Sequence, residues 1–190
     1  MKWFQVAFLF CLLSCETSVS VDSSTVSEAI PAGAIADEFT DTPGLSKVTI
    51  NDGSGNLAQT GLVKDGAREG NWVEYHPNGL IKSVTSYVDG KLEGLRAEMN
   101  TSGQLEKRMM YHNNQLHGEY KEFKYSTVKE ERNYNGGKLE GTVKIYYDNG
   151  KIMEEGAYKN GTRDGVSKWY DQEGNVTIEY EYRNGELVKK

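Results

Sequence analysis

Glycine recurs along this chain with a period of about 24 residues, and this regularity constrains the fold more than any other feature. One glycine column is spaced by 24, 24, 23 and 24 residues and consists of Gly70, Gly94, Gly118, Gly141 and Gly165. A tyrosine column follows the same period without a gap and consists of Tyr87, Tyr111, Tyr134, Tyr158 and Tyr182. A repeat of this length indicates an array of similar small units, each packed on its neighbours.

Each unit reads as two short strands joined by tight turns. The runs Asn71–His76 and Leu80–Val88 are rich in strand-forming residues, and Pro77-Asn78-Gly79 lies between them. Asn-Gly in this position predicts a type I′ hairpin turn, which needs positive φ at both central residues. The sequence therefore predicts an all-β fold: an elongated antiparallel β-meander of stacked hairpins, each of about 24 residues, in a single layer.

The two columns are predicted to be structural. Ile81 and Tyr87 are six residues apart, so an uninterrupted strand places both on one face, where the apolar and tyrosine columns bury one another. Glycines such as Gly70 and Gly94 are expected to leave room for aromatic rings from the neighbouring strand.

The repeat domain is predicted to span residues 46–190, as a half repeat followed by about five repeats. Lys47–Val63 supplies the half repeat, because Gly55 precedes Gly79 by 24 residues. In the third unit, Lys124–Thr127 replaces the usual glycine turn, which predicts an altered turn there. The terminal strands of such a sheet are exposed, so edge-to-edge self-association is possible.

The repeat resembles a known family. Tyr134-x-Gly136-Gly137-Lys-Leu-Glu-Gly141, continued by Asn149-Gly150, looks like the MORN repeat variant of bacteria, and the resemblance covers roughly residues 50–188. It implies a β-hairpin array. Members of the wider class are regarded as scaffolds and as protein or phospholipid binders, and the family includes proteins labelled as antitoxin-like.

The first fifteen residues have the features of a targeting signal. Met1-Lys2 is a positive start, and Trp3 to Leu13 is an apolar run too short to span a bilayer. Leu12-Leu13-Ser14-Cys15 resembles the bacterial lipoprotein box, which implies lipidation of Cys15 and removal of residues 1–14. An ordinary signal peptide with an incidental Cys15 is the alternative. The resemblance implies a lipid-anchored protein of the bacterial cell envelope, attached to the outer membrane.

Residues 15–45 are predicted to form a disordered tether between the membrane and the folded part. From residue 16 onward this stretch is rich in Ser, Thr and Ala and holds six acids but no Lys or Arg, a composition that cannot bury enough apolar surface to fold. The whole chain has 22 basic and 28 acidic residues; without Lys2 and these six acids, 21 basic and 22 acidic residues remain. The repeat domain is nearly neutral, so a nucleic-acid partner is not expected.

The sequence contains no recognisable catalytic or metal-binding motif. His76, His112 and His117 lack metal-ligand spacing, and no Gly-x-Ser-x-Gly elbow occurs. We therefore expect a protein with no enzymatic activity, metal or cofactor. A ladder of residues directly before the glycine column is expected to form a solvated charged edge, paired with nearby Lys and Arg. These residues are Glu69, Glu93, His117, Glu140 and Asp164.

Aromatic side chains outside the tyrosine column are the candidates for partner binding. They are Trp72, Tyr120, Tyr147, Trp169 and Tyr180. Tyr and Trp are favoured at interfaces, although covering both faces of a one-layer sheet can also use these rings. The leading hypothesis is binding of another, unidentified protein. The alternatives are antitoxin-like neutralisation of a toxic protein, implied only by the family, and binding of phospholipid or glycan; interspersed charges count against phospholipid.

Overall fold

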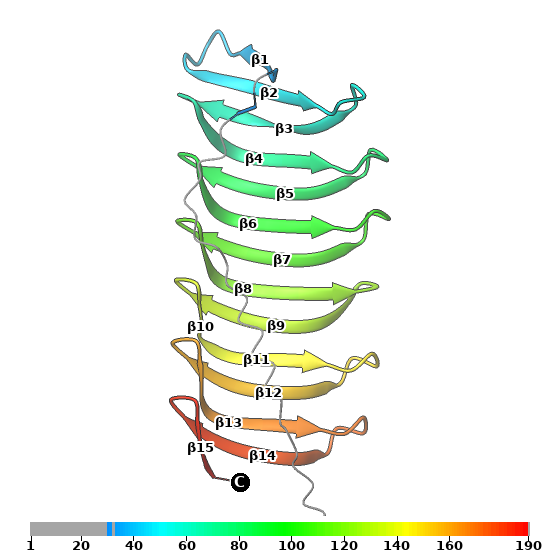
Figure 1. The fold of residues 1–190 in the computed structure, drawn as a ribbon, viewed down its shortest axis with the longest axis vertical. Coiled ribbons are helices and arrows are strands. Elements are labelled where there is room, and N and C mark those ends of the chain that lie inside the picture. The colour runs from blue at the N-terminus through cyan, green and yellow to red at the C-terminus, as the bar shows by residue number, and fades with distance from the viewer. Residues whose placement is uncertain (1–29, 32, 190) are drawn as a thin grey trace, which may run out of the picture.

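The protein, seen in a computed structural model that describes residues 30–189 except residue 32, is one open antiparallel sheet (Figure 1). Its strands are β1 (Ile35–Glu38), β2 (Leu45–Asn51), β3 (Leu57–Lys64), β4 (Ala67–Tyr75), β5 (Ile81–Val88), β6 (Lys91–Met99), β7 (Leu105–His112), β8 (Gln115–Lys124), β9 (Thr127–Asn135), β10 (Lys138–Leu139), β11 (Gly141–Tyr146), β12 (Ile152–Lys159), β13 (Thr162–Tyr170), β14 (Val176–Arg183) and β15 (Glu186–Lys189). They pair in chain order, with the short β10 beside β9.

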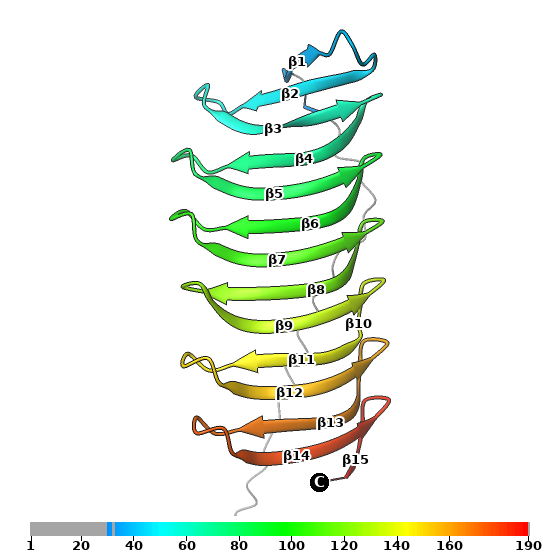
Figure 2. The ribbon, with the colours of Figure 1, turned by 180° about the vertical axis from the view of Figure 1, so that it is seen from behind.

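This single-layer meander confirms the predicted fold class. The hairpins stack along the long axis of the molecule, as both ribbon views show (Figure 1, Figure 2). Within residues 30–189, no helix has the length and apolar character needed to cross a membrane.

The two long edges of the sheet carry different turns. At one edge, which we call the turn edge, two-residue turns have positive φ at both positions, as at Asp89 (49°) and Gly90 (76°). At the opposite loop edge, only the glycine of His76–Leu80 has positive φ, and the Gly79 amide donates to the His76 carbonyl at 2.8 Å. The type I′ prediction for Asn78-Gly79 was therefore wrong: the I′ turns lie at the turn edge, and the loops contain one left-handed glycine.

The third hairpin has the altered turn that the sequence predicts. Between β8 and β9 the five-residue loop is replaced by a two-residue turn, in which Tyr125 and Ser126 have φ of 51° and 65°. Tyr125 is 77% exposed at the loop edge. The shorter turn accounts for the spacing of 23 rather than 24 residues between Gly118 and Gly141, and β9 continues to pair with β8 along its length.

A β-bulge next to each loop separates the apolar column from the tyrosine column. Glu74 pairs with Ser83, whereas Tyr75 pairs with Ile81, which leaves Lys82 as an extra residue. One extra residue shifts every later side chain to the other face. Ile81 therefore lies on the face opposite Tyr87 and is 40% exposed, so the prediction that these columns bury one another was wrong.

The glycine column also marks bulges rather than gaps for aromatic rings. Thr85 pairs with Arg96 and Tyr87 with Leu92, so Ser86 alone lies opposite three residues centred on Gly94. All five column glycines have positive φ, between 64° and 111°, and none would place a Cβ within 4 Å of an aromatic ring. Glycine is required here for the backbone conformation. Our expectation that these positions accommodate rings was wrong.

The residues before the glycine column join consecutive repeats. Glu69 accepts a hydrogen bond from the amide of Asp89 at 3.0 Å, and Glu140 does the same for Asn160 at 2.9 Å. We call these side chains the cap residues; they are Glu69, Glu93, His117, Glu140 and Asp164. Beside each one, the second residue of the turn donates to a backbone carbonyl of the preceding repeat at 2.8–3.1 Å. The predicted solvated ladder is therefore a row of turn caps.

The core lies on one face of the sheet. Strand register assigns the buried side chains of the described residues to the same face, which we call the inner face. Its central row contains Val48, Gly61, Trp72, Thr85, Arg96, Met109, Tyr120, Arg132, Val143, Gly156, Ser167 and Tyr180. The alternate side chains form the outer face, where none of the described residues is buried.

The folded part begins before residue 46. Ile35–Glu38 forms β1 on the edge of β2, and Ile30 and Ala34 pack against the inner-face cluster around Trp72. These residues belong to the predicted tether, whose boundary at residue 45 was therefore wrong. An open strand edge offers backbone hydrogen bonds that composition alone does not reveal. The predicted signal peptide, Cys15 and residues 16–29 and 32 of the tether lie outside the described residues.

Candidate binding face

The inner face carries arginines stacked on aromatic rings. The guanidinium carbon of Arg68 lies 4.0 Å from the ring centroid of Trp72, and that of Arg132 lies 5.1 Å from the ring of Tyr120. Arg163 faces three rings, at 5.3 Å from Tyr158, 5.4 Å from Trp169 and 5.7 Å from Tyr182. Stacking of this kind orients the planar guanidinium and rigidifies both partners.

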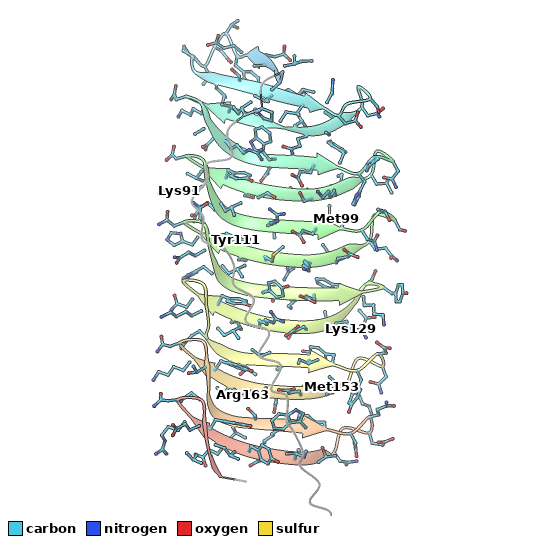
Figure 3. The ribbon with its side chains drawn as sticks, viewed as in Figure 1. Lys91, Met99, Tyr111, Lys129, Met153 and Arg163 are labelled. Atoms are coloured by element: carbon cyan, nitrogen blue, oxygen red, sulfur yellow. The ribbon has the colours of Figure 1, made fainter. Side chains whose placement is uncertain are left out.

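Two of these arginines, and Arg96 of the same face, bond to glutamates of the inner face. Arg96 donates to Glu98 at 2.9 Å, Arg132 donates to Glu130 at 2.6 Å, and Arg163 donates to Glu154. Figure 3 places Tyr111 and Arg163 toward the turn edge, and Met99, Lys129 and Met153 toward the loop edge. The inner face thus carries a row of aromatic rings, and glutamates of the same face neutralise the charges of these three arginines.

Burial and these ion pairs set the ionisation of the face. Burial alone would lower the pKa of Arg163, but the hydrogen bond to Glu154 and the electrostatic interactions with Tyr158, Glu154 and Tyr182 together outweigh it and raise that pKa. Burial raises the pKa of the Tyr120 and Tyr158 hydroxyls, and for Tyr120 the bond to Glu122 adds to the effect. Arginines stay charged and tyrosines neutral at ordinary pH, so none of these groups is prepared for proton transfer.

The aromatic rings become accessible toward the C-terminal hairpins. Trp72 is 1% exposed and Tyr87 is 8% exposed, within a cluster that also contains Val48 and Val63. Around β13 and β14, by contrast, Trp169, Tyr180 and Tyr182 are half-buried. The centroids of Trp169 and Tyr180 lie 5.6 Å apart in an edge-to-face contact, and Tyr180 meets Tyr182 at 6.4 Å.

This geometry agrees with a comparison of the sequence with family models. The model described as "MORN repeat variant" matches residues 68–89, 139–160 and 163–184. Three segments of this chain match the MORN repeat variant. Two of them begin on the first strand of a hairpin, and the segment 139–160 begins on β10, directly before β11. All three end in a two-residue turn, so the family motif coincides with the structural unit.

The unmatched hairpins of the array keep the geometry of the matched ones but depart from their sequence. Asn114 replaces the turn glycine after β7, and Tyr125-Ser126 replaces the loop between β8 and β9. Asn114 nevertheless adopts φ of 67°, and its amide donates to the Leu92 carbonyl as the turn glycines do in other repeats. Asn tolerates the left-handed region, so the fold survives the substitution.

Comparisons with other proteins add little. No curated protein matches the chain. Among solved structures, TarM is similar at 13% identity and a TM-score of 0.36, over 57% of this chain and 21% of TarM. A mutant of TarM from S. aureus, in complex with fondaparinux, α-GlcNAc-glycerol and UDP, has 15% identity and a TM-score of 0.35, over 50% of this chain and 19% of that one. The chain thus spans about a fifth of those structures, and a likeness this weak carries no functional argument.

The five predicted binding residues do not form one surface. Trp72 and Tyr120 (7% exposed) are part of the core of the sheet, which contradicts their prediction as partner contacts. Tyr147 lies at the loop edge, where its hydroxyl donates to the Tyr170 carbonyl at 2.6 Å. Only Trp169 and Tyr180 come together as half-buried rings. In the pairing order, Trp169 on β13 lies four strands beyond Tyr120 on β8 and eight beyond Trp72 on β4, because large aromatics on a repeat are distributed along its axis.

The inner-face arginines were not predicted as site residues from the sequence. They are Arg68, Arg96, Arg132 and Arg163. Arg68 and Arg163 each stand two residues before a column glycine, and Arg132 stands two residues before Tyr134. That position relative to the columns was the signal that could have identified three of them.

Hollows at the loop edge do not carry a ligand site of recognisable chemistry. The larger one, of about 450 Å³, is lined by Lys82 and Arg96 among others. Both cations are engaged, Lys82 with Glu74 at 3.6 Å and Arg96 with Glu98 at 2.9 Å. Within the part of the chain that the structure describes, no three His, Cys, Asp or Glu side chains are grouped to hold a metal ion.

Proposed function

We propose that this chain is a non-catalytic, lipid-anchored MORN-type repeat module of the bacterial cell envelope that binds another protein through the inner face of its last hairpins. MORN repeats are commonly membrane-binding or protein-binding modules. The observation that carries the proposal is the half-buried group of Trp169, Tyr180 and Tyr182 beside Arg163. Trp, Tyr and Arg are the side chains that dominate binding energy at protein interfaces.

The charge arrangement favours a protein over a phospholipid as the partner. A phospholipid headgroup requires available cations, whereas Arg96, Arg132 and Arg163 already bond to glutamates. Rigid rings with oriented guanidinium groups instead suit the mixed apolar and polar contacts of a protein interface.

In-cell crosslinking of the tagged full-length protein, followed by mass spectrometry, tests the proposal. We expect one dominant protein partner, lost when Trp169→Ser and Tyr180→Ser are combined. Val166→Ser is the matched control, because Val166 is 42% exposed on the outer face of the same strand β13. Recovery of lipid and abundant envelope proteins alone contradicts protein binding. A toxic protein as the captured partner would make the module an antitoxin-like neutraliser.

The membrane anchor is tested separately by Cys15→Ser. Loss of the lipidated thiol removes both acyl chains that hold such a protein on the bilayer. We therefore expect the variant to move from the membrane pellet to the soluble fraction, whereas the outer-face variant Val166→Ser stays with the membrane. A Cys15→Ser protein that still sediments with membranes excludes the lipoprotein assignment.

A further inference from the structure

The five joints between consecutive repeats are chemically alike except for one. At each joint a cap residue accepts a hydrogen bond from the first amide of a two-residue turn, 19 or 20 residues further along the chain. Four caps are carboxylates: Glu69, Glu93, Glu140 and Asp164. At the joint between β8 and the β9–β10 turn, the cap is His117, whose Nδ1 faces the amide of Gly136 at 3.4 Å.

This exception changes how the joint responds to acid. A backbone amide only donates, so Nδ1 of His117 must accept, which requires the neutral imidazole with its proton on Nε2. A protonated imidazole has donors on both nitrogens and cannot make this bond. Carboxylate caps keep their acceptors above about pH 5, whereas histidine is the side chain that changes charge between about pH 5 and 8. We propose that His117 makes this joint the acid-sensitive joint of the repeat array.

Groups around His117 determine what protonation does. The ring of His112, on β7, lies 5.6 Å from the ring of His117, and Glu93 accepts from His112 Nδ1 at 2.8 Å. The hydrogen bond from His112, then that from the Asn113 amide, lowers the pKa of Glu93, and the charges of both histidines act in the same direction. Glu93 therefore attracts the positive charge of either protonated ring. This attraction holds a protonated His117 near Glu93, while its hydrogen bond from the Gly136 amide is lost.

The backbone around the joint limits the loosening to a local event. The amide of Gly137 still donates to the Leu116 carbonyl at 2.8 Å, a bond that no side chain affects. On the other side of the turn, β10 is only two residues long. Beyond it, β9 pairs with β11 through Glu131 with Lys144 and Glu130 with Ile145. Acid thus removes one of these two bonds between the β9–β10 turn and β8, while the sheet on either side remains paired.

Hydrogen exchange measured by NMR on the full chain tests this inference, because the equivalent amides serve as controls within one molecule. After correction for intrinsic exchange, we expect the protection of Gly136 to fall about three- to fivefold between about pH 7.5 and 5.5, as for loss of one hydrogen bond. The amides of Asn160 and Asn184, capped by carboxylates, should keep their protection. An equal fall at all three amides overturns the inference.

Two substitutions separate the cap from its surroundings. His117→Glu installs the cap that other repeats use, and His117→Gln installs an acceptor that does not titrate; either should make Gly136 protection independent of pH in this range. His112→Gln removes the neighbouring imidazole and should leave the fall at Gly136 in place. A fall that persists in His117→Gln, or disappears in His112→Gln, shows that His117 is not the sensor. The measurement is independent of the proposed partner, so it stands or fails separately from the proposed function.

Discussion

Gly61 shows how a single missing side chain positions the largest residue of the core. A Cβ at this position would meet the indole Cγ and Cε2 atoms of Trp72 at 2.5 Å, well inside van der Waals contact. The indole nitrogen in turn donates to the Leu62 carbonyl at 2.8 Å. The sequence analysis recognised that glycine would make room for an aromatic ring but assigned this role to the periodic glycines. Gly61 stands outside those columns, so its role follows from a contact between strands that periodicity does not contain.

Gly61→Ala should therefore destabilise the protein by about 1–3 kcal/mol, the usual range for overpacking a close-packed site. The indole must move away from β3, and its hydrogen bond to Leu62 weakens. Chemical denaturation followed by tryptophan fluorescence measures the change. Gly53→Ala is the matched control, since a Cβ there has nothing within 4 Å and its φ is not positive. Equal midpoints for the two variants would remove Gly61 from the core.

At the scale of the hairpin, the two bulges decide which residues share a face. The loop-edge bulge moves Ile81 away from Tyr87, and the wide bulge at the glycine column allows the cap residue to reach the next turn. Strand existence and turn positions could be predicted from the sequence because Asn-Gly and Asp-Gly punctuate it. Bulges could not be, because counting residues assumes an unbroken alternation. The extra residue of each bulge, such as Lys82, is present in the sequence, but no residue type marks it as a bulge.

The loops are held by Asx-type bonds that a titration can detect. Asp171 accepts from both the side chain and the backbone amide of Asn175, at 3.0 and 2.8 Å, and these bonds lower its pKa below 3.8. Because the pKa of Asp171 is lowered, the bonds are fully present at a pH above the ordinary aspartate pKa. They are lost as the pH falls through the lowered pKa. Asn175→Ala should raise the pKa of Asp171 toward its ordinary value, as measured by NMR of the carboxyl carbon. Asp148, whose pKa Lys129 lowers, should not change.

Across the whole molecule, strands contact mainly their immediate neighbours in the chain. This locality is why the meander could be predicted from periodicity: once a hairpin is recognised, its neighbours follow. The tether boundary could not be predicted in the same way. Ile35–Glu38 lacks the pattern of a repeat and pairs only because the edge of β2 is available. The candidate binding face was only partly predicted, because Trp169 and Trp72 look alike in the sequence and differ in what covers them.

Removal of one whole hairpin should leave a folded, shorter protein. Deletion of residues 91–114 takes out β6 and β7 and joins Gly90 to Gln115, so the turn, its backbone bond to Arg68 and the strand directions are all preserved. We expect retained β-sheet circular dichroism and a length reduced by about 9–10 Å, two strand spacings, in small-angle scattering. Deletion of residues 91–102 instead brings a loop-edge end to the turn edge and should not fold. If both deletions behave alike, the hairpin is not the unit of the array.

The difference between the two edges determines where one repeat can gain or lose residues. The caps and backbone bonds that tie each turn to the neighbouring repeat lie at the turn edge, whereas neighbouring loops are bonded through side chains, as Tyr147 is to the Tyr170 carbonyl. The third hairpin has a shorter turn than its neighbours at the loop edge and keeps its pairing. An inserted residue at the turn edge would separate a cap from its amide, but at the loop edge it lengthens a connection that side chains, not the turn caps, join to its neighbours. The loop edge is therefore where this scaffold can accept foreign segments, epitopes or altered loops while the register of the sheet is preserved.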